Sequence, residues 1–266
     1  MIAAAPDLLA TIVAATRRIV AVREAARPAR IVAAEQQRTP RGDSFEQALR
    51  ADTGNGPRII AECKRRSPSK GILRQDYDPA AHALAYASAG AAAISVLTEP
   101  TFFDGSLEHL REVRAAVDIP VLRKDFVICE YQLLEAAALG ADAVLLIGAA
   151  LEPSDLVHLL QAAARLQLAA LVEVHDLDEL RRACDAGARV IGVNSRNLRT
   201  LTVHPDVLAA VAAQMPADVT AVAESGIRTP DDIARLSRAG YHAFLVGERL
   251  IAQPDPGAAL RELRGA

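Results

Sequence analysis

The sequence predicts an α/β protein, a (β/α)8 (TIM) barrel with an N-terminal helical extension. From residue 58 onward, eight short apolar runs rich in Val, Ile and Leu alternate with segments that carry helix-start and helix-stop residues. Runs of this kind are typical of parallel strands that are buried on both faces. Eight strand–helix units in about 205 residues match the count of the barrel. A doubly wound sheet usually has fewer strands, and no GxGxxG fingerprint follows the first run.

The strands and several helices can be placed by residue number. Strands are expected at residues 58–62, 91–98, 119–124, 141–148, 168–174, 189–195, 219–225 and 242–247. Four of the intervening helical segments end at a glycine, the usual residue after a last helical turn, at residues 78–90, 130–140, 176–187 and 229–240.

Residues 1–57 precede the first strand and are expected to form the N-terminal helical extension. One or two helices are expected there, over residues 6–26 and 44–51. A chain of 266 residues fits one large domain. We therefore interpret residues 1–57 as an extension packed on the barrel of residues 58–266, within a single domain.

Composition favours a small molecule as the partner. The formal net charge is −3 and like charges form no run, so we expect binding to neither nucleic acid nor membrane. The three cysteines form no CxxC pair, which is typical of reduced thiols in a cytoplasmic protein. Asp7 and Arg17 interrupt the apolar N-terminus, so a secretory signal is not expected. The six histidines lack ligand spacing, so a metal site is not expected either.

Polar side chains gather where the expected strands end, which is where barrel enzymes build their active sites. Glu62 and Lys64 are two residues apart in the first strand, so both point to one face, and Cys63 points to the other. Any one such residue is more often a solvated rim group, and Glu62 with Lys64 could be a structural ion pair. Because the set comes from five strands, it favours general acid–base chemistry. Its members are Glu62, Lys64, Lys124, Glu173, Asn194, Arg196, Glu224 and Ser225.

Lysine is used sparingly in this chain. Only Lys64, Lys70 and Lys124 occur, against 27 arginines. Arginine does not release its proton in a protein, whereas a crowded lysine can act as an acid or form a Schiff base. Lysine at a strand end therefore suggests a chemical role for Lys64 and Lys124.

The loops after the last two strands are a frequent phosphate site in this fold. Gly226 and Gly247 lie in them and would allow a phosphate to approach the backbone closely. Both are equally compatible with ordinary turn glycines.

Eight stretches between residues 58 and 250 resemble the indole-3-glycerol phosphate synthase family, in the family's order. They read IIAECKRRSPSKG, TEPTFFDGSLEHL, VLRKDF, GADAVLLI, LVEVHD, GVNSRNL, AESGI and LVGERL. The resemblance implies a carboxy-lyase of tryptophan biosynthesis that uses no metal or organic cofactor. Its reaction is ring closure, decarboxylation and dehydration of 1-(2-carboxyphenylamino)-1-deoxyribulose 5-phosphate to indole-3-glycerol phosphate.

The resemblance also implies residue roles. Lys124 would protonate the substrate carbonyl, Glu173 would transfer a proton at the dehydration step, and Lys64 would be a second acid. Glu62 and Asn194 would orient these groups, while Ser225 and Glu224 would hold substrate hydroxyls. Arg196 would face the anthranilate carboxylate. The remaining expected contacts are Phe103, Phe126 and Leu146 along the aromatic pocket, and Gly226, Gly247, Glu248, Ser67 and Lys64 near the phosphate.

The chain departs from the family pattern at Arg66 and Arg249, which bear on loop mobility and phosphate affinity. No fused isomerase domain is expected in 266 residues. Two alternatives remain: a Schiff-base lyase of the same fold acting on another sugar phosphate through Lys124 or Lys64, and a non-catalytic barrel. The sequence leaves open the oligomeric state, which lysine protonates which oxygen, and whether the loop with Lys70 closes over substrate.

Overall fold

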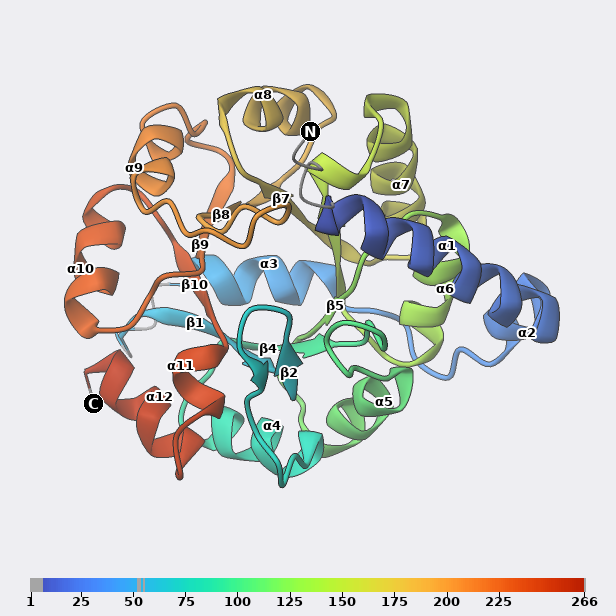
Figure 1. Cartoon of the computed structure of the whole chain (residues 1–266), viewed down its shortest axis with the longest axis horizontal. Helices are drawn as coiled ribbons and strands as arrows, with labels where there is room; N and C mark the ends of the chain where they lie inside the picture. The colour runs from blue at the N-terminus through green and yellow to red at the C-terminus, as the bar shows by residue number, and fades with distance from the viewer. Residues whose placement is uncertain (1–6, 52–53, 55, 266) are drawn as a thin grey trace, which may run out of the picture.

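Eight parallel strands close into a barrel in the computed structural model, which describes residues 7–51, 54 and 56–265 (Figure 1). The order around the barrel is β1-β10-β9-β8-β7-β6-β5-β4. The strands are β1 (Arg58–Cys63), β4 (Ala93–Leu97), β5 (Val121–Lys124), β6 (Ala143–Ile147), β7 (Ala169–Val174), β8 (Val190–Asn194), β9 (Thr220–Glu224) and β10 (Ala243–Val246). Each falls in one of the eight apolar runs, except that β1 extends one residue past its run, so the predicted fold class is confirmed.

Helices form a ring outside the strands (Figure 1). They are α4 (Pro79–Ser88), α5 (Leu107–Ala116), α6 (Glu130–Ala138), α7 (Pro153–Arg165), α8 (Leu177–Asp185), α9 (Asp206–Ala212), α10 (Pro230–Arg238), α11 (Glu248–Ile251) and α12 (Pro256–Arg264). Local chemistry sets their ends. Asp78 caps α4 by accepting from the backbone N–H of Ala81 at 2.9 Å, and Gly90, at a φ of +85°, follows its last turn.

The strands separate two apolar layers. Alternate residues point inward to fill the barrel or outward to meet the helices. Ile60, Leu122 and Leu245 belong to the inner cluster. Cys63 belongs to the outer cluster, as its position between Glu62 and Lys64 predicted.

The described part of the N-terminal segment contains three helices rather than the expected one or two. These are α1 (Leu8–Ala26), α2 (Ala29–Ala34) and α3 (Gly42–Arg50). Pro28 stands between α1 and α2, and because proline disrupts a helix interior, it ends one helix and begins the next. Val32 of α2 is buried against Tyr131 of α6, which explains why so short a helix is stable here.

Helix α3 crosses the amino end of the barrel and contacts β1, β4, β7 and β9 (Figure 1). Phe45 and Leu49 are fully buried and belong to the same cluster as the inward-facing strand residues. The helix begins directly against β7, because a Cβ added to Gly42 would lie 2.5 Å from the backbone nitrogen of Ala169. Helix α3 therefore closes the barrel at the end opposite the strand carboxyl ends.

A buried carboxylate ties the chain before α3 to the barrel. Asp142 is fully buried and accepts from Arg38 at 2.8 Å and from Arg114 at 3.0 Å. It also accepts from the backbone N–H groups of Arg41 at 2.9 Å and Val121 at 3.1 Å. These partners compensate for the loss of hydration of the carboxylate.

The replacement Phe45→Ala is expected to lower the free energy of unfolding by about 3–5 kcal/mol, because it empties a site inside a closed barrel. Urea denaturation measures the change. Leu84→Ala is the control, since Leu84 is 49% exposed on α4. Equal effects of the two replacements would contradict the role of α3 as a core element.

Between β1 and α4 the chain forms a short antiparallel hairpin, β2 (Arg66–Ser67) with β3 (Gly71–Ile72). The sequence predicts only a Ser-Pro-Ser turn here, since paired segments of two residues leave no recognisable alternation. Among the described residues, no helix has the length and hydropathy required to cross a membrane.

Candidate active site

A cavity of about 720 Å³ lies at the carboxyl ends of the strands. Its wall contains every residue predicted for the site except Leu146. The predicted residues that it does contain are Glu62, Lys64, Ser67, Phe103, Phe126, Lys124, Glu173, Asn194, Arg196, Glu224, Ser225, Gly226, Gly247 and Glu248. Segments more than 180 residues apart thus meet in one place, because all eight strands end at this face.

The prediction for Leu146 is wrong. Leu146 is fully buried in the outer apolar layer, whereas its neighbours Leu145 and Ile147 line the cavity. Successive side chains of a strand point to opposite faces, so a shift of one residue exchanges the barrel interior for the helix interface.

The centre of the site is a cation between two buried carboxylates. Lys124 Nζ lies 3.1 Å from Glu173 Oε2 and 3.7 Å from Glu224 Oε2. Glu173 is fully buried and Glu224 is 2% exposed. Three strands supply these groups: β5, β7 and β9. Because both carboxylates compete for one ammonium group, their protonation states are coupled.

The pKa values of the three groups diverge as a result. Burial lowers the pKa of Lys124, but Glu173 and Glu224 outweigh it and raise that pKa above its ordinary value. Burial raises the pKa of Glu173, yet Lys124 and His175 hold it well below its usual range. Burial and the charge of Glu173 together raise the pKa of Glu224 to about 8. The directions of these shifts favour ionisation of Glu173 over ionisation of Glu224, so Glu224 is the carboxyl that more readily holds a proton.

A second lysine–glutamate pair lies at the carboxyl end of β1, with Glu62 in the strand and Lys64 directly after it. Lys64 donates to Glu62, and both side chains are largely buried. A Cβ added to Gly247 would lie 2.3 Å from Glu62 Oε1, so the glycine provides the space that Glu62 occupies. Gly247 thus shapes the carboxylate side of the site in addition to its place in the loop after β10.

A buried network supports Lys124 from behind. Arg123, fully buried, points outward and donates to Asp125 at 2.8 Å and to Glu135 of α6 at 3.3 Å. Asp125 also accepts from the Thr98 hydroxyl at 2.6 Å. These bonds fix the end of β5, and with it the backbone that carries Lys124.

The apolar wall is built around two phenylalanines. The rings of Phe103 and Phe126 lie 6.1 Å apart, centroid to centroid, at an angle of 38°. Glu99 holds the loop that carries Phe103, accepting from the backbone N–H groups of Phe102 at 2.7 Å and Phe103 at 3.1 Å. Such a pair of rings offers a flat face to an aromatic substrate.

The β2–β3 hairpin borders the cavity through Ser67, Pro68 and Ser69. Ser67 is 6% exposed, and its hydroxyl makes no hydrogen bond to a described protein group. Arg196 donates to the backbone carbonyl of Leu201 at 3.1 Å, and its guanidinium lies 3.4 Å from the hydroxyl of Ser69. A buried hydroxyl without a partner at a cavity wall is a natural contact for a bound polar group.

Comparison with known proteins identifies the family. A model of the family described as indole-3-glycerol phosphate synthase matches residues 9–263. The chain belongs to the indole-3-glycerol phosphate synthase family. An indole-3-glycerol phosphate synthase of Albidiferax ferrireducens is 46% identical over 258 residues, covering 97% of this chain and 98% of that protein. Another, of a Nocardioides species, is 56% identical over 210 residues, covering 79% and 81%.

Solved structures agree in fold. A 3-hexulose-6-phosphate synthase superposes with a TM-score of 0.63 at 18% identity, covering 78% of this chain and 98% of that one. A thiamine phosphate pyrophosphorylase from Pyrococcus furiosus superposes with a TM-score of 0.60 at 20% identity, covering 79% and 95%. At these identities the likeness concerns the barrel fold alone.

The two residues at which a departure from the family pattern is expected can be located. Arg66 is exposed on β2. Arg249 lines the cavity, but its guanidinium pairs with Glu262 of α12 at 2.8 Å. Arg228, which no strand-end pattern predicts, also lines the cavity, and its backbone carbonyl accepts from Arg249 at 3.3 Å. It lies four residues beyond the end of β9, too far from the strand for its position to be read from the strand pattern.

A glycine on β8 makes room for Glu224. A Cβ added to Gly192 would lie 2.1 Å from Glu224 Oε1, so an alanine there must displace the carboxyl group. We expect Gly192→Ala to reduce kcat by about tenfold or more, since Glu224 would lose its place beside Lys124. Steady-state kinetics on folded protein measure the effect. Unchanged kcat would contradict the importance of the Glu224 position.

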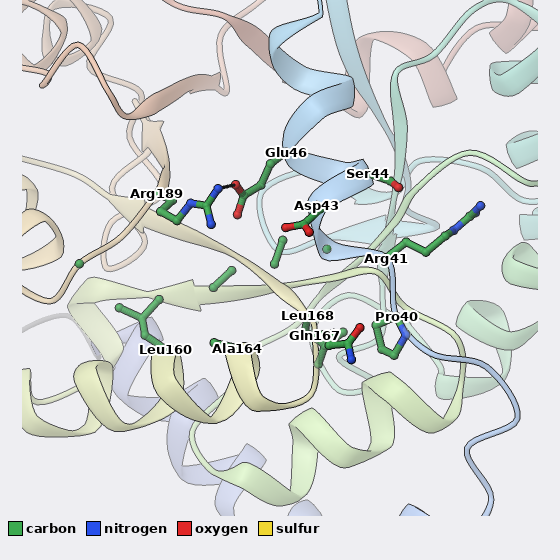
Figure 2. A pocket seen from close by; sticks show the side chains of 14 residues that line it. Pro40, Arg41, Asp43, Ser44, Glu46, Leu160, Ala164, Gln167, Leu168 and Arg189 are labelled. Carbon is green, nitrogen blue, oxygen red and sulfur yellow. Dashed lines mark ion pairs between the residues drawn. The ribbon is translucent and has the colours of Figure 1, made fainter.

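A second cavity, of about 610 Å³, opens at the amino end of the barrel beside α3 (Figure 2). Glu46 and Arg189 point toward each other there and form an ion pair of 2.7 Å. Arg41 extends away and donates to the backbone carbonyl of Asp118. None of the predicted site residues borders this cavity. Within the described part of the chain, no group of three or more His, Cys, Asp or Glu residues is arranged to hold a metal ion.

Proposed function

We propose that the cavity at the carboxyl ends of the strands carries out the reaction of the family. An anthranilate ring carbon attacks the sugar carbonyl carbon of 1-(2-carboxyphenylamino)-1-deoxyribulose 5-phosphate. The new ring then loses carbon dioxide and water to give indole-3-glycerol phosphate. The observation that carries the proposal is the contact of Lys124 with Glu173 at 3.1 Å beside an aromatic wall, in a chain of this family.

Lys124 is the proposed acid for ring closure. As the carbon–carbon bond forms, negative charge develops on the carbonyl oxygen, and an ammonium group can neutralise it by donating a proton. Glu173 and Glu224 keep Lys124 protonated until substrate arrives. The largely buried position of Lys124 strengthens the interaction, because little water competes for the charge.

Glu173 is the proposed base for the dehydration step. Its carboxylate is ionised, so it can accept the proton that leaves the ring system as the hydroxyl group departs. Lys64 is the proposed second acid, which protonates the departing hydroxyl so that it leaves as water. Glu62 and Asn194 orient these groups, and Glu224 and Ser225 bind substrate hydroxyls.

The substrate ends have separate partners in this proposal. Arg196 binds the anthranilate carboxylate, and Phe103 and Phe126 contact the ring. Gly226, Gly247 and Glu248 offer backbone N–H groups to the phosphate, with Ser67 and Lys64 nearby. The unpartnered hydroxyl of Ser67 supports this placement. Ser225 and Gly226 adopt left-handed backbone conformations, with φ values of +64° and +72°, and both line the cavity.

The test is conversion of 1-(2-carboxyphenylamino)-1-deoxyribulose 5-phosphate by the purified protein, followed by the fluorescence of the indole product. Absence of product from folded protein would contradict the proposal.

The Schiff-base alternative predicts a covalent adduct when substrate is added with borohydride. We expect no adduct, because the pKa of Lys124 is raised and the amine is therefore protonated. A cytoplasmic location, a monofunctional protein and a domain boundary near residue 57 stay predictions.

A further inference from the structure

His175 lies at the end of β7 and connects the active-site carboxylate to helix α8. It follows Glu173 by two residues, so both side chains point to the same face of the strand. His175 Nε2 lies 3.4 Å from Glu173 Oε1, the oxygen on the far side from Lys124. His175 is not part of the cavity wall, so it reaches the substrate only through Glu173.

Glu179 of α8 holds the imidazole from the other side. Its Oε2 accepts from His175 Nδ1 at 3.0 Å and from the backbone N–H of His175 at 2.9 Å. Asp176 caps the helix and accepts from the backbone N–H of Glu179 at 2.8 Å. The helix start therefore directs the Glu179 carboxylate back onto His175.

Glu179 has little freedom to move away. It is 9% exposed, and a Cβ added to Gly148, in the 3-10 turn Gly148–Ala150 after β6, would lie 3.7 Å from its Oε2. The same Cβ would lie 3.3 Å from the backbone carbonyl of Glu173. The turn after β6 thus packs against both carboxylate-bearing segments and keeps the His175 ring between them.

The two carboxylates favour a charged imidazole, since their oxygens lie 3.4 Å and 3.0 Å from its two ring nitrogens. Each ring nitrogen faces a carboxylate oxygen, and only the protonated ring has an N–H on both. Burial lowers the pKa of His175, but Glu173 and Glu179 outweigh it and raise that pKa to about 10. The other nearby charges are Arg182 on α8, 4.0 Å from Glu179 Oε1, and Lys124, on the opposite side of Glu173.

We propose that His175, held by Glu179, is a positioning residue that keeps Glu173 ionised and in place while Lys124 engages the substrate. In the free protein, Glu173 has two cationic partners, one on each oxygen. The proposed chemistry requires Lys124 to turn toward the substrate carbonyl, and Glu173 then needs a second cation to remain an effective base. The inference rests on the proposed function for its kinetic consequence, but the charge of His175 can be measured without substrate.

The kinetic test compares the pH profiles of His175→Gln and the wild-type protein. Glutamine retains an N–H donor near the position of Nε2 but carries no charge. Loss of the cation raises the pKa of Glu173, so the acid limb of kcat should move to higher pH. At the acid end kcat should fall about tenfold, and the difference should shrink as the pH rises. Glu179→Gln should lower the pKa of His175 but move the acid limb of kcat less than His175→Gln does, because its imidazole still carries a charge in acid.

The matched control is His158→Gln, because His158 is a largely exposed histidine on α7 that pairs with Glu130. It should retain the wild-type profile. A uniform loss of kcat in His175→Gln at every pH, with an unmoved acid limb, would mean a merely structural role and would overturn the proposal.

Histidine side-chain NMR of the protein without substrate provides the second measurement. The His175 signal, assigned from the His175→Gln variant, should remain that of an imidazolium through neutral pH, and Glu179→Gln should shift its titration downward. A neutral His175 at pH 7 would overturn the proposal even if the wild-type protein is fully active. Conversely, an inactive wild-type protein with a charged His175 would contradict the proposed function and leave the charge assignment standing.

Discussion

Lys124→Met is expected to reduce kcat at least about a hundredfold while the barrel stays folded. Methionine has a similar length but no ionisable group, so no acid would be available to protonate the carbonyl oxygen during ring closure. Substrate should still bind, because the aromatic wall and the proposed phosphate contacts are untouched. Steady-state kinetics with circular dichroism provide the measurement. Turnover within about tenfold of wild type would remove Lys124 from the role of acid.

The same replacement has a stability cost that depends on pH. Glu173 and Glu224 are both buried and would lose their shared cation. Breaking a buried ion pair in this way costs about 3–5 kcal/mol. Loss of the Lys124 charge would raise the folded-state pKa of Glu224 further above its unfolded value, whereas His175 still faces Glu173. The free energy of unfolding should therefore be closest to wild type in acid and fall as the pH rises through that raised pKa.

Lys124→Met combined with Glu224→Gln separates the two effects. The double variant keeps a polar group at position 224 but removes one of the two buried acids. It should recover part of the stability at neutral and alkaline pH without recovering turnover. Recovery of turnover would show that the single variant is inactive because it is destabilised and not because it lacks an acid.

Glu173→Gln is expected to reduce kcat at least about a hundredfold with little change in KM, since glutamine is similar in size but cannot accept the proton. A loss confined to KM would make Glu173 a binding residue instead. Glu130→Gln is the control of the same chemical change, because Glu130 is exposed on α6 and pairs with Arg165 and His158. It should retain wild-type kinetics.

Glu173 also contributes to stability in the wild-type protein, with a defined sign. Its pKa in the folded state is held below its ordinary value, so it stabilises the fold above about pH 4.3, the usual value of an unfolded glutamate. This contribution is lost as the pH falls toward the folded-state pKa. Glu173→Gln should therefore flatten the acid side of the curve of unfolding free energy against pH.

The barrel could be predicted from the sequence because each strand is a short apolar run between helices with recognisable ends. The carboxyl ends of parallel strands meet at one face, so charged residues at those ends could be assigned to one site without coordinates. The direction in which the Glu62 and Lys64 side chains point could be predicted as well. Two polar residues at a spacing of two indicate the side of β1 that faces the barrel interior. The glycines that make room for Glu62 and Glu224 could not be predicted, since the space beside a glycine depends on a neighbouring strand.

The sequence by itself determined the architecture and the family, and it placed most of the charged residues that line the cavity at strand ends, but not Arg228. Only the tertiary structure decided that Leu145 and Ile147, not Leu146, face the cavity. The strand AVLLI is apolar at every position, so the sequence does not show which of its alternate residues face the barrel interior and which face the helices. Likewise, the link from Glu173 through His175 to Glu179 depends on where β7 ends and α8 begins, and the apolar run of residues 168–174 does not show this.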